Sequence, residues 1–295
     1  MRITLTGATG RIGETLVAAL KARGDEVTVL SRNPERATQR LDVPAVNWDP
    51  KSGPAPLNAL EVDDEDVGQR WTKSVRQEIL DSREQGTRNL VAGIAAAADR
   101  PKALVSASAS GIYGPHGAEP VDETAPAGDD YLAHVCEVWE REALAAQAHG
   151  LRVAVLRTGI VLDAHGGALS KMLTPFKAGV GGPVAGGRQY MPWIHLDDVV
   201  GLYLAAIDGP DWSGPINVSA PTPVTNAEFS KALGKAIRRP AFSPVPKFAL
   251  SALYGEMSTI VVNGVNMVPR RAEQLGYRFA HPEVGEALTA TLRKD

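Results

Sequence analysis

The chain has 295 residues, of which 44% are apolar, and a formal net charge of −3 at pH 7. This length and apolar share suffice for one large α/β domain or for a domain with an appendage. Acidic and basic residues nearly balance, with 34 Asp and Glu against 31 Lys and Arg, so no nucleic-acid or membrane surface is expected.

The sequence lacks the marks of secretion and of membrane insertion. No stretch reaches the roughly 18 consecutive apolar residues of a spanning helix, and no basic segment followed by an apolar run opens the chain. The single cysteine, Cys136, excludes an internal disulfide and a cysteine-based metal cluster. We therefore expect a soluble, cytoplasmic protein, and leave its oligomeric state open.

Strand and helix patterns alternate through the first half of the chain. Short apolar runs rich in β-branched residues predict strands, and apolar residues spaced by three and four predict helices. The predicted strands cover residues 2–6, 26–30, 103–106 and 153–157, and the predicted helices cover residues 13–23, 71–98 and 132–149. Helices between strands imply parallel pairing with right-handed crossovers, so we predict a doubly wound parallel α/β sheet.

The pattern changes after Thr158. A glycine-rich stretch over residues 166–187 is followed by "QYMPWIHLDD", which we interpret as a loop and lid leading into a helix over 197–207. Asp197 is the expected N-cap of that helix. Two helix-like runs after Pro221 predict a small C-terminal cap. We therefore assign residues 1–165 and 196–220 to the sheet domain, and residues 166–195 and 221–295 to the lid and the cap.

The opening "MRITLTGATGRIG" places glycine at every third position between the first strand and the first helix. Gly7 permits the tight turn, Gly10 allows the backbone to approach a pyrophosphate, and Gly13 allows close packing of helix on strand. The helix N-terminus then offers unpaired N–H groups to the phosphates. We predict dinucleotide binding here, with a plain strand–helix turn as the alternative. The expected cofactor-binding residues are Gly7, Thr9, Gly10, Arg11, Ile12 and Gly13.

The end of the second strand indicates which dinucleotide is bound. An NAD site favours an acidic residue there, whereas this chain has Ser31 and Arg32, with Arg36 one helical turn further on. A guanidinium can bind a 2′-phosphate through two hydrogen bonds. We therefore predict NADP(H) as the cofactor; the alternative is a solvated charge on a loop.

Several long motifs follow the glycine loop in order: "VLSRNPE", "RWTKSVRQEILDSR", "SASASGIYG", "LRTGIVL" and "GRQYMPWIHLDDV". Together with "TGATGRIG" they resemble the extended short-chain dehydrogenase/reductase superfamily. More narrowly, the chain is similar over nearly its whole length to an atypical subgroup of NADP(H)-binding, sugar-nucleotide-epimerase-like proteins. The resemblance implies a Rossmann domain with a small C-terminal cap. It also implies that Glu78, Arg83, Ser106, Ala107 and Val161 lie at the cofactor.

The chain departs from the superfamily's usual chemistry. That chemistry uses a tyrosine four residues before a lysine, because the lysine lowers the tyrosine's pKa. In the corresponding segment, "DYLAHVCEVWE", Tyr131 is followed four places later by Val135, and Cys136 comes next. The subgroup is similar in lacking this pair, so the superfamily's reaction is not implied for this chain.

A second departure lies before the helix that begins near Trp71. In relatives a buried fourth strand runs there, whereas this chain has "LNALEVDDEDVGQRW". Four consecutive acidic residues, Asp63 to Asp66, could not be buried unpaired in a central strand. We expect the strand to be missing here, either in the chain itself or through residues omitted from the written sequence.

The candidate catalytic residues are Ser108, Tyr131 and Tyr113. Ser108 follows a strand's carboxyl end, where open α/β sheets bind ligands; alternatively Ser106 and Ser108 only cap the turn. Tyr113 either packs beside the site or donates a proton, and packing is the more common role. Tyr131 could act as an acid only if a positive charge replaces the missing lysine.

His195 lies next to Trp193 on the substrate side and is more often structural than a proton carrier. No histidine pair has metal-ligand spacing, so we predict no metal. The run from Gly179 to Pro183 is either a mobile lid or a surface loop.

Two functions remain open from the sequence. One is an NADP(H)-dependent oxidoreductase or epimerase-like enzyme that acts on a small polar substrate, a nucleotide-linked one being an option. The other is a non-catalytic NADP(H)-binding redox sensor or regulatory protein. We favour the enzyme, because a shaped pocket over a nicotinamide is typical of catalysis.

Overall fold

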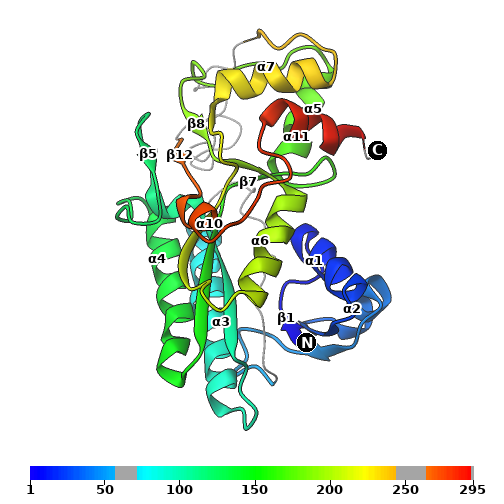
Figure 1. Ribbon diagram of the computed structural model, residues 1–295, viewed down its shortest axis with the longest axis vertical. Helices are drawn as coiled ribbons and strands as arrows, with labels where there is room; N and C mark the ends of the chain where they lie inside the picture. The colour runs from blue at the N-terminus through cyan, green and yellow to red at the C-terminus, as the bar shows by residue number, and fades with distance from the viewer. Residues whose placement is uncertain (57–71, 244–263, 294–295) are drawn as a thin grey trace.

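The structure, a computed structural model, describes residues 1–56, 72–243 and 264–293 (Figure 1). Six parallel strands form two three-stranded sheets with helices packed on them, which confirms the predicted α/β class. Among the helices in these ranges, none is both long and apolar enough to cross a bilayer.

The first sheet is built from the N-terminal part of the chain. Its strands are β1 (Arg2–Leu5), β2 (Glu26–Ser31) and β3 (Ala45–Asn47), connected by α1 (Arg11–Ala22) and α2 (Pro34–Leu41). Leu16, Val17 and Leu20 of α1 share one face because they are spaced by one, three and four residues, and all are buried. This face packs into the same core as Leu5 and Val29 of the strands.

The second sheet contains the longest strands. It is formed by β4 (Ala103–Ala109), β6 (Arg152–Thr158) and β10 (Gly214–Val218), with α3 (Lys73–Ala96), α4 (Tyr131–Leu144) and α6 (Leu196–Asp208) around it. Figure 1 shows α3 and α4 running side by side, and α6 beside α1. The inner strand β6 has buried residues on both faces, from Val153 to Arg157, and so forms a nearly continuous apolar run.

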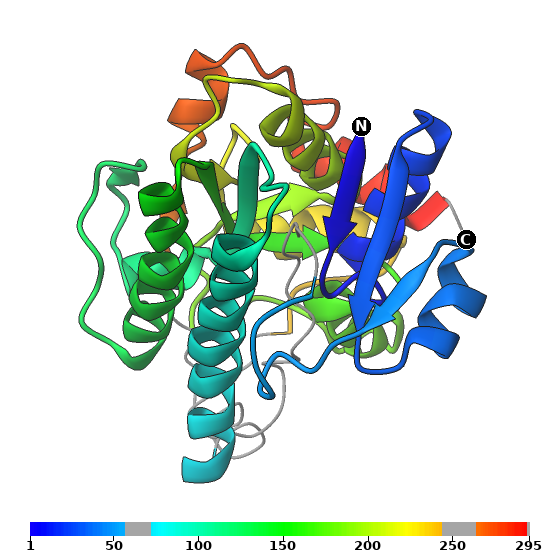
Figure 2. The same cartoon turned by 90° about the horizontal axis from the view of Figure 1, so that it is seen from below.

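The two sheets meet along the edges of β1 and β4. The strand orders are β3-β2-β1 and β4-β6-β10, and within the described ranges no strand joins β1 to β4. The predicted loss of a strand concerns residues 57–71, which lie outside those ranges. Figure 2 shows the two sheets as separate groups of strands. Leu5, Val105 and Leu202 belong to one buried cluster, so side chains from both sheets and from α6 connect them.

A separate core lies beyond the sheets. Helices α5 (Gly167–Lys177), α7 (Asn226–Ala236) and α11 (Val284–Arg293) pack around buried Trp193 and Phe229. The short pairs are β7 (Ile160–Leu162) with β9 (Trp193–His195), β8 (Tyr190–Met191) with β11 (Val224–Thr225), and β5 (Pro120–Val121) with β12 (Asn266–Met267). The remaining elements are η1 (Ser110–Tyr113), η2 (Ala145–His149) and α10 (Arg270–Gln274). The domain boundaries taken from the sequence stay a prediction.

The N-cap of α6 differs from the prediction. The cap is His195, whose Nδ1 accepts the backbone N–H of Asp197 at 3.1 Å. The prediction of Asp197 was wrong because the helix begins one residue earlier, at Leu196. Asp197 therefore lies in the first turn, where a carboxylate still complements the helix dipole.

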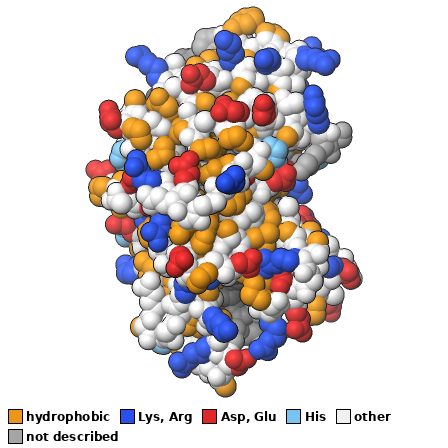
Figure 3. Space-filling model, in the orientation of Figure 1, with side chains coloured by type: hydrophobic (Ala, Val, Ile, Leu, Met, Phe, Trp, Pro, Cys, Tyr) orange, Lys and Arg blue, Asp and Glu red, His pale blue; other side chains and the backbone are white. Residues whose placement is uncertain are grey.

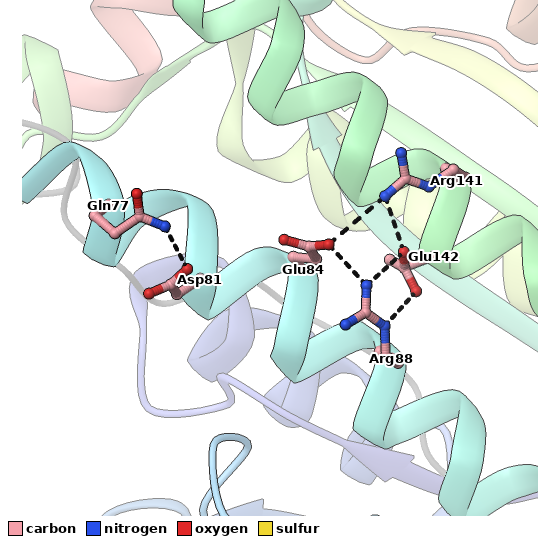
Figure 4. A network of polar contacts seen from close by, with 6 residues as sticks. All are labelled: Gln77, Asp81, Glu84, Arg88, Arg141 and Glu142. Atoms are coloured by element: carbon pink, nitrogen blue, oxygen red, sulfur yellow. Dashed lines mark hydrogen bonds and ion pairs between the residues drawn. The ribbon is translucent and has the colours of Figure 1, made fainter.

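Acidic and basic side chains are interspersed on the face of the molecule seen in Figure 3. One organised group of such charges joins α3 to α4 (Figure 4). Arg88 binds Glu84 at 2.7 Å and Glu142 at 3.1 Å, and Arg141 also binds Glu142 at 3.1 Å. Burial raises the pKa of the Glu142 carboxyl, but hydrogen bonds from Arg88 and Arg141 outweigh it and hold the pKa below its ordinary value of 4.5.

We predict that Arg88→Ala lowers the free energy of unfolding at pH 7 by about 0.5–1 kcal/mol, the range for exposed ion pairs. The pKa of Glu142 is depressed in the folded state. The ionised Glu142 carboxylate therefore adds to the free energy of unfolding above pH 4.5, and this stabilisation is lost as the pH falls through the folded-state pKa. Urea unfolding from pH 7 to pH 3 measures this. The control is Arg239→Ala, which removes an exposed arginine. The prediction would be contradicted if the difference in free energy of unfolding between wild type and Arg88→Ala did not shrink in acid.

Candidate functional site

A cavity of about 440 Å³ lies at the carboxyl ends of β1 and β2. This is the edge at which parallel α/β sheets bind ligands, beside the point where the strand order reverses. Six residues predicted to bind the cofactor line it: Gly7, Thr9, Ser31, Arg32, Arg36 and Arg83. The cavity is therefore placed where the sequence predicts the nucleotide.

The glycine loop has the geometry that a dinucleotide needs. Gly7 adopts a φ of 61°, a value that favours glycine, and its carbonyl accepts the N–H of Gly10 at 3.1 Å. A Cβ on Gly13 would lie 2.6 Å from the Cα of Ala8, so only glycine lets α1 approach the loop this closely. The first N–H groups of α1 are left without partners in the helix itself, as at any helix N-terminus. The loop and the helix thus fit a pyrophosphate group.

The rim of this cavity carries positive charge. Arg32 and Arg36 line it, and within the described ranges neither forms an ion pair. Arg40 lies beside them but is paired with Glu14 of α1. The Ser31 hydroxyl accepts the N–H of Asn33 at 3.1 Å, which keeps Ser31 at the start of the turn that presents both arginines. Two guanidinium groups that have no ion-pair partner among the described residues, beside a hydroxyl, suit a phosphate ester.

A second cavity, of about 360 Å³, lies at the carboxyl ends of β4 and β6. Its walls are mainly apolar, and they include Ile12, Ala107, Ser108 and Val161 among the predicted residues. Arg83 and Trp139 line both cavities, and the guanidinium lies 5.0 Å from the centre of the indole ring. The two cavities are therefore adjacent and share one wall.

None of the α4 side chains that line the second cavity is an acid. Leu132 and Cys136, one helical turn apart, line the cavity. Tyr131 does not line the cavity. Its hydroxyl donates to the backbone oxygen of Arg76 at 2.5 Å, and the guanidinium of Arg76 lies 4.1 Å from its ring centre. The role of Tyr131 as a proton donor stays a prediction.

Ser108 joins a buried network that the sequence does not reveal. Its hydroxyl donates to Oε1 of Glu140 at 2.6 Å, and Glu140 is bound by Arg157 through two hydrogen bonds of 2.9 and 2.8 Å. All three side chains are buried. Ser108 therefore does not simply cap its own turn. Ser106, in contrast, makes a local bond to the carbonyl of Ala107 and lines neither cavity.

Tyr113 extends the same network away from the cavity. Its hydroxyl accepts from Arg157 at 3.0 Å and donates to Asn217 at 2.6 Å. Burial raises the pKa of Tyr113 to about 12, although the charge of Arg157 opposes this. Because Tyr113 is fully buried and lines neither cavity, its place in the structure is that of a packed, hydrogen-bonded tyrosine.

Two further residues expected at the cofactor lie elsewhere. Arg11 binds Asp163 through hydrogen bonds of 2.7 and 3.2 Å, so its side chain ties α1 to the segment after β7. Glu78 is exposed on α3, 3.7 Å from the Nζ of Lys51, and lines neither cavity. Gly10 and Gly13 are also absent from the cavity walls and shape the loop instead.

His195, the N-cap of α6, stacks on His281 with ring centres 3.8 Å apart. The carboxylate of Asp197 lies 3.7 Å from Nδ1 of His195 and 3.5 Å from Nε2 of His281. Three such groups can in principle hold a metal ion. However, the lone pair on Nδ1 of His195 already accepts the N–H of Asp197, so binding there would break the cap. The absence of a metal stays a prediction.

Comparison with known proteins agrees with this site. The sequence profile of the NAD dependent epimerase/dehydratase family matches residues 3–219, and a domain of unknown function, DUF1731, matches residues 245–291. The chain belongs to the NAD dependent epimerase/dehydratase family.

Its relatives span the whole chain. It is 39% identical to the chloroplastic "Epimerase family protein SDR39U1 homolog" of Arabidopsis thaliana, covering 99% of this chain and 87% of that protein. It is 36% identical to "Epimerase family protein YfhF" of Bacillus subtilis, covering 98% and 97%. A crystal structure of human SDR39U1 (isoform2) with NADPH superposes with a TM-score of 0.90 at 35% identity, covering 100% of both chains.

The sequence reasoning missed Trp139 and the face of α4 that carries Leu132, Cys136 and Glu140. These three residues recur every four positions, so helical periodicity places them on one face. That spacing could have shown that Cys136 lies on the same helix face as Glu140.

We predict that Gly13→Ala destabilises the protein by about 1–3 kcal/mol and abolishes dinucleotide binding, because the added Cβ would force α1 away from the loop. The matched control is Gly285→Ala, where a Cβ meets nothing within 4 Å. Thermal unfolding and cofactor titration of both variants measure this. Normal binding by a stable Gly13→Ala variant would refute the assignment of the loop.

Proposed function

We propose that the protein binds NADP(H) in preference to NAD(H), in the paired cavities at the carboxyl ends of the sheets. Arg32 and Arg36 at the rim of the first cavity support this most directly, since their free charges suit a 2′-phosphate. The glycine loop holds the pyrophosphate, and Arg83 with Trp139 lies where the two halves of the dinucleotide join. The NADPH in the crystal structure of the human relative supports the same assignment.

We infer an oxidoreductase or epimerase-like activity on a small molecule bound in the second cavity. When bound, the nicotinamide supplies hydride transfer. Ser108 is the residue that would contact the substrate oxygen and orient it. General acid catalysis typically contributes about 10²–10⁴-fold, and the α4 side chains that line the cavity, Leu132, Val135, Cys136 and Trp139, include no acid. Turnover is therefore expected to be slow.

One observation favours a second function, that of a non-catalytic NADP(H) sensor. Cys136 follows Val135, which stands where the superfamily's lysine would be. Burial raises the pKa of the Cys136 thiol to about 12, so this group is neutral. A leucine and a neutral thiol can bind a nicotinamide without exchanging protons. This alternative predicts tight NADPH binding with no turnover.

We predict that wild-type protein binds NADPH more tightly than NADH, and that Arg32→Ala weakens NADPH binding about 10- to 100-fold, the range for a charged hydrogen bond. NADH binding should not change. The control is Arg2→Ala, an exposed arginine paired with Asp99. Fluorescence titration of each protein with both cofactors measures these constants, and equal wild-type affinity for NADH and NADPH would contradict the proposal.

A panel of alcohols with NADP⁺ and of carbonyl compounds with NADPH tests for catalysis. We predict slow turnover that Ser108→Ala reduces and Tyr131→Phe leaves unchanged, because Tyr131 lies outside the cavity. The readout is the absorbance of NADPH. Tight NADPH binding without turnover on either panel would instead favour the sensor.

A further inference from the structure

The hydroxyl of Ser108 is the central polar group of the second cavity. We propose that Glu140 fixes the direction of its hydrogen, so that the cavity selects small, largely apolar molecules bearing a hydroxyl over the matching carbonyl compounds. This inference rests on the proposed function, since it names the class of molecule that the same site takes. Ser108 is then the specificity-determining residue, and Glu140 is the residue that positions it.

The direction of the Ser108 hydrogen follows from its partner. Oε1 of Glu140 lies 2.6 Å from Oγ of Ser108, and an ionised carboxylate can only accept hydrogen bonds. Arg157 pairs with the same carboxylate through two hydrogen bonds of 2.9 and 2.8 Å, in a bidentate fork geometry. Glu140 and Arg157 keep side-chain exposures of only 8% and 9%, so water does not compete for either group. Ser108 must therefore donate to Glu140, and only its lone pairs remain for a ligand.

Of the other polar side chains that line the cavity, Thr158, Cys136 and Asp130 add little that could bind a carbonyl oxygen. The hydroxyl of Thr158 donates to the carbonyl of Leu156 at 3.3 Å, and the thiol of Cys136 points to the carbonyl of Ala109 at 3.8 Å. Asp130 accepts the N–H of Ala133 and is itself an acceptor. Arg83 lies against Trp139, at the junction with the first cavity.

The remaining lining side chains are mostly apolar. The apolar side chains that line the cavity are Ile12, Ile79, Leu132, Val135, Ile160, Val161, Pro192 and Val265. A mainly apolar wall with hydrogen-bond acceptors on Ser108 and Asp130 matches a hydrocarbon body with one hydroxyl donor. Ser110 also lines the cavity, and no described carboxylate holds its hydrogen, so it provides a matched serine for comparison.

Binding of cyclohexanol and cyclohexanone to the NADP⁺-loaded protein tests this without requiring turnover. The two probes have nearly the same shape and differ in whether the oxygen donates or only accepts. We expect cyclohexanol to bind about two- to tenfold more tightly, the value of one neutral hydrogen bond, as measured by ligand-observed NMR titration. Ser108→Ala should remove this preference, and Ser110→Ala should keep it.

Glu140→Gln provides an independent check, because a glutamine amide can donate to Ser108 and release its hydrogen toward the cavity. The preference should then shrink or reverse, which a purely structural role of Glu140 would not cause. The wild-type comparison decides the proposal even if this variant does not fold. Equal binding of the probes, tighter binding of cyclohexanone, or no binding of either at millimolar concentration would overturn the proposal. Each outcome is separate from the NADPH titration that tests the proposed function.

Discussion

The ion pair between Glu140 and Arg157 connects helix α4 to the central strand β6, and the substrate side of the site depends on it. Burying two charges is costly unless each is fully hydrogen-bonded, and here two bonds join the pair while Ser108 and Tyr113 satisfy its remaining groups. The network continues through Tyr113 to Asn217 on β10. This one charge pair thus fixes α4, Ser108 and the strands β6 and β10 in a single arrangement.

A second constraint on the site is the boundary between the two sheets. In the described ranges, β1 and β4 share no backbone hydrogen bonds, and the sheets are instead held together by α6 and a common apolar core. Both cavities lie along this boundary, at the carboxyl ends of β1, β2, β4 and β6. The strand order reverses at the same place, so the ligand site coincides with the boundary for topological reasons.

Much of the fold and of the nucleotide side could be predicted from the sequence. The apolar spacing in α1 and the β-branched runs in β2 and β6 are local patterns, and the structure places each element within a few residues of its predicted bounds. The lining of the second cavity could not be predicted in the same way. Tyr131 was chosen by its chemistry, but its hydroxyl donates to the backbone oxygen of Arg76 and its side chain does not line the cavity. The N-cap of α6 was also predicted wrongly: it is His195 and not Asp197, because the helix begins at Leu196.

The sequence by itself determined the α/β class, the glycine loop and the arginines that follow the second strand, because each depends on residues close together in the chain. Only the tertiary structure decided the environment of Ser108, since its partner Glu140 is 32 residues away and the partners Tyr113 and Asn217 are 104 residues apart. Local periodicity specifies which face of an element is buried. It does not specify which polar groups on different elements meet once those faces pack, and that meeting sets the direction of a hydrogen bond.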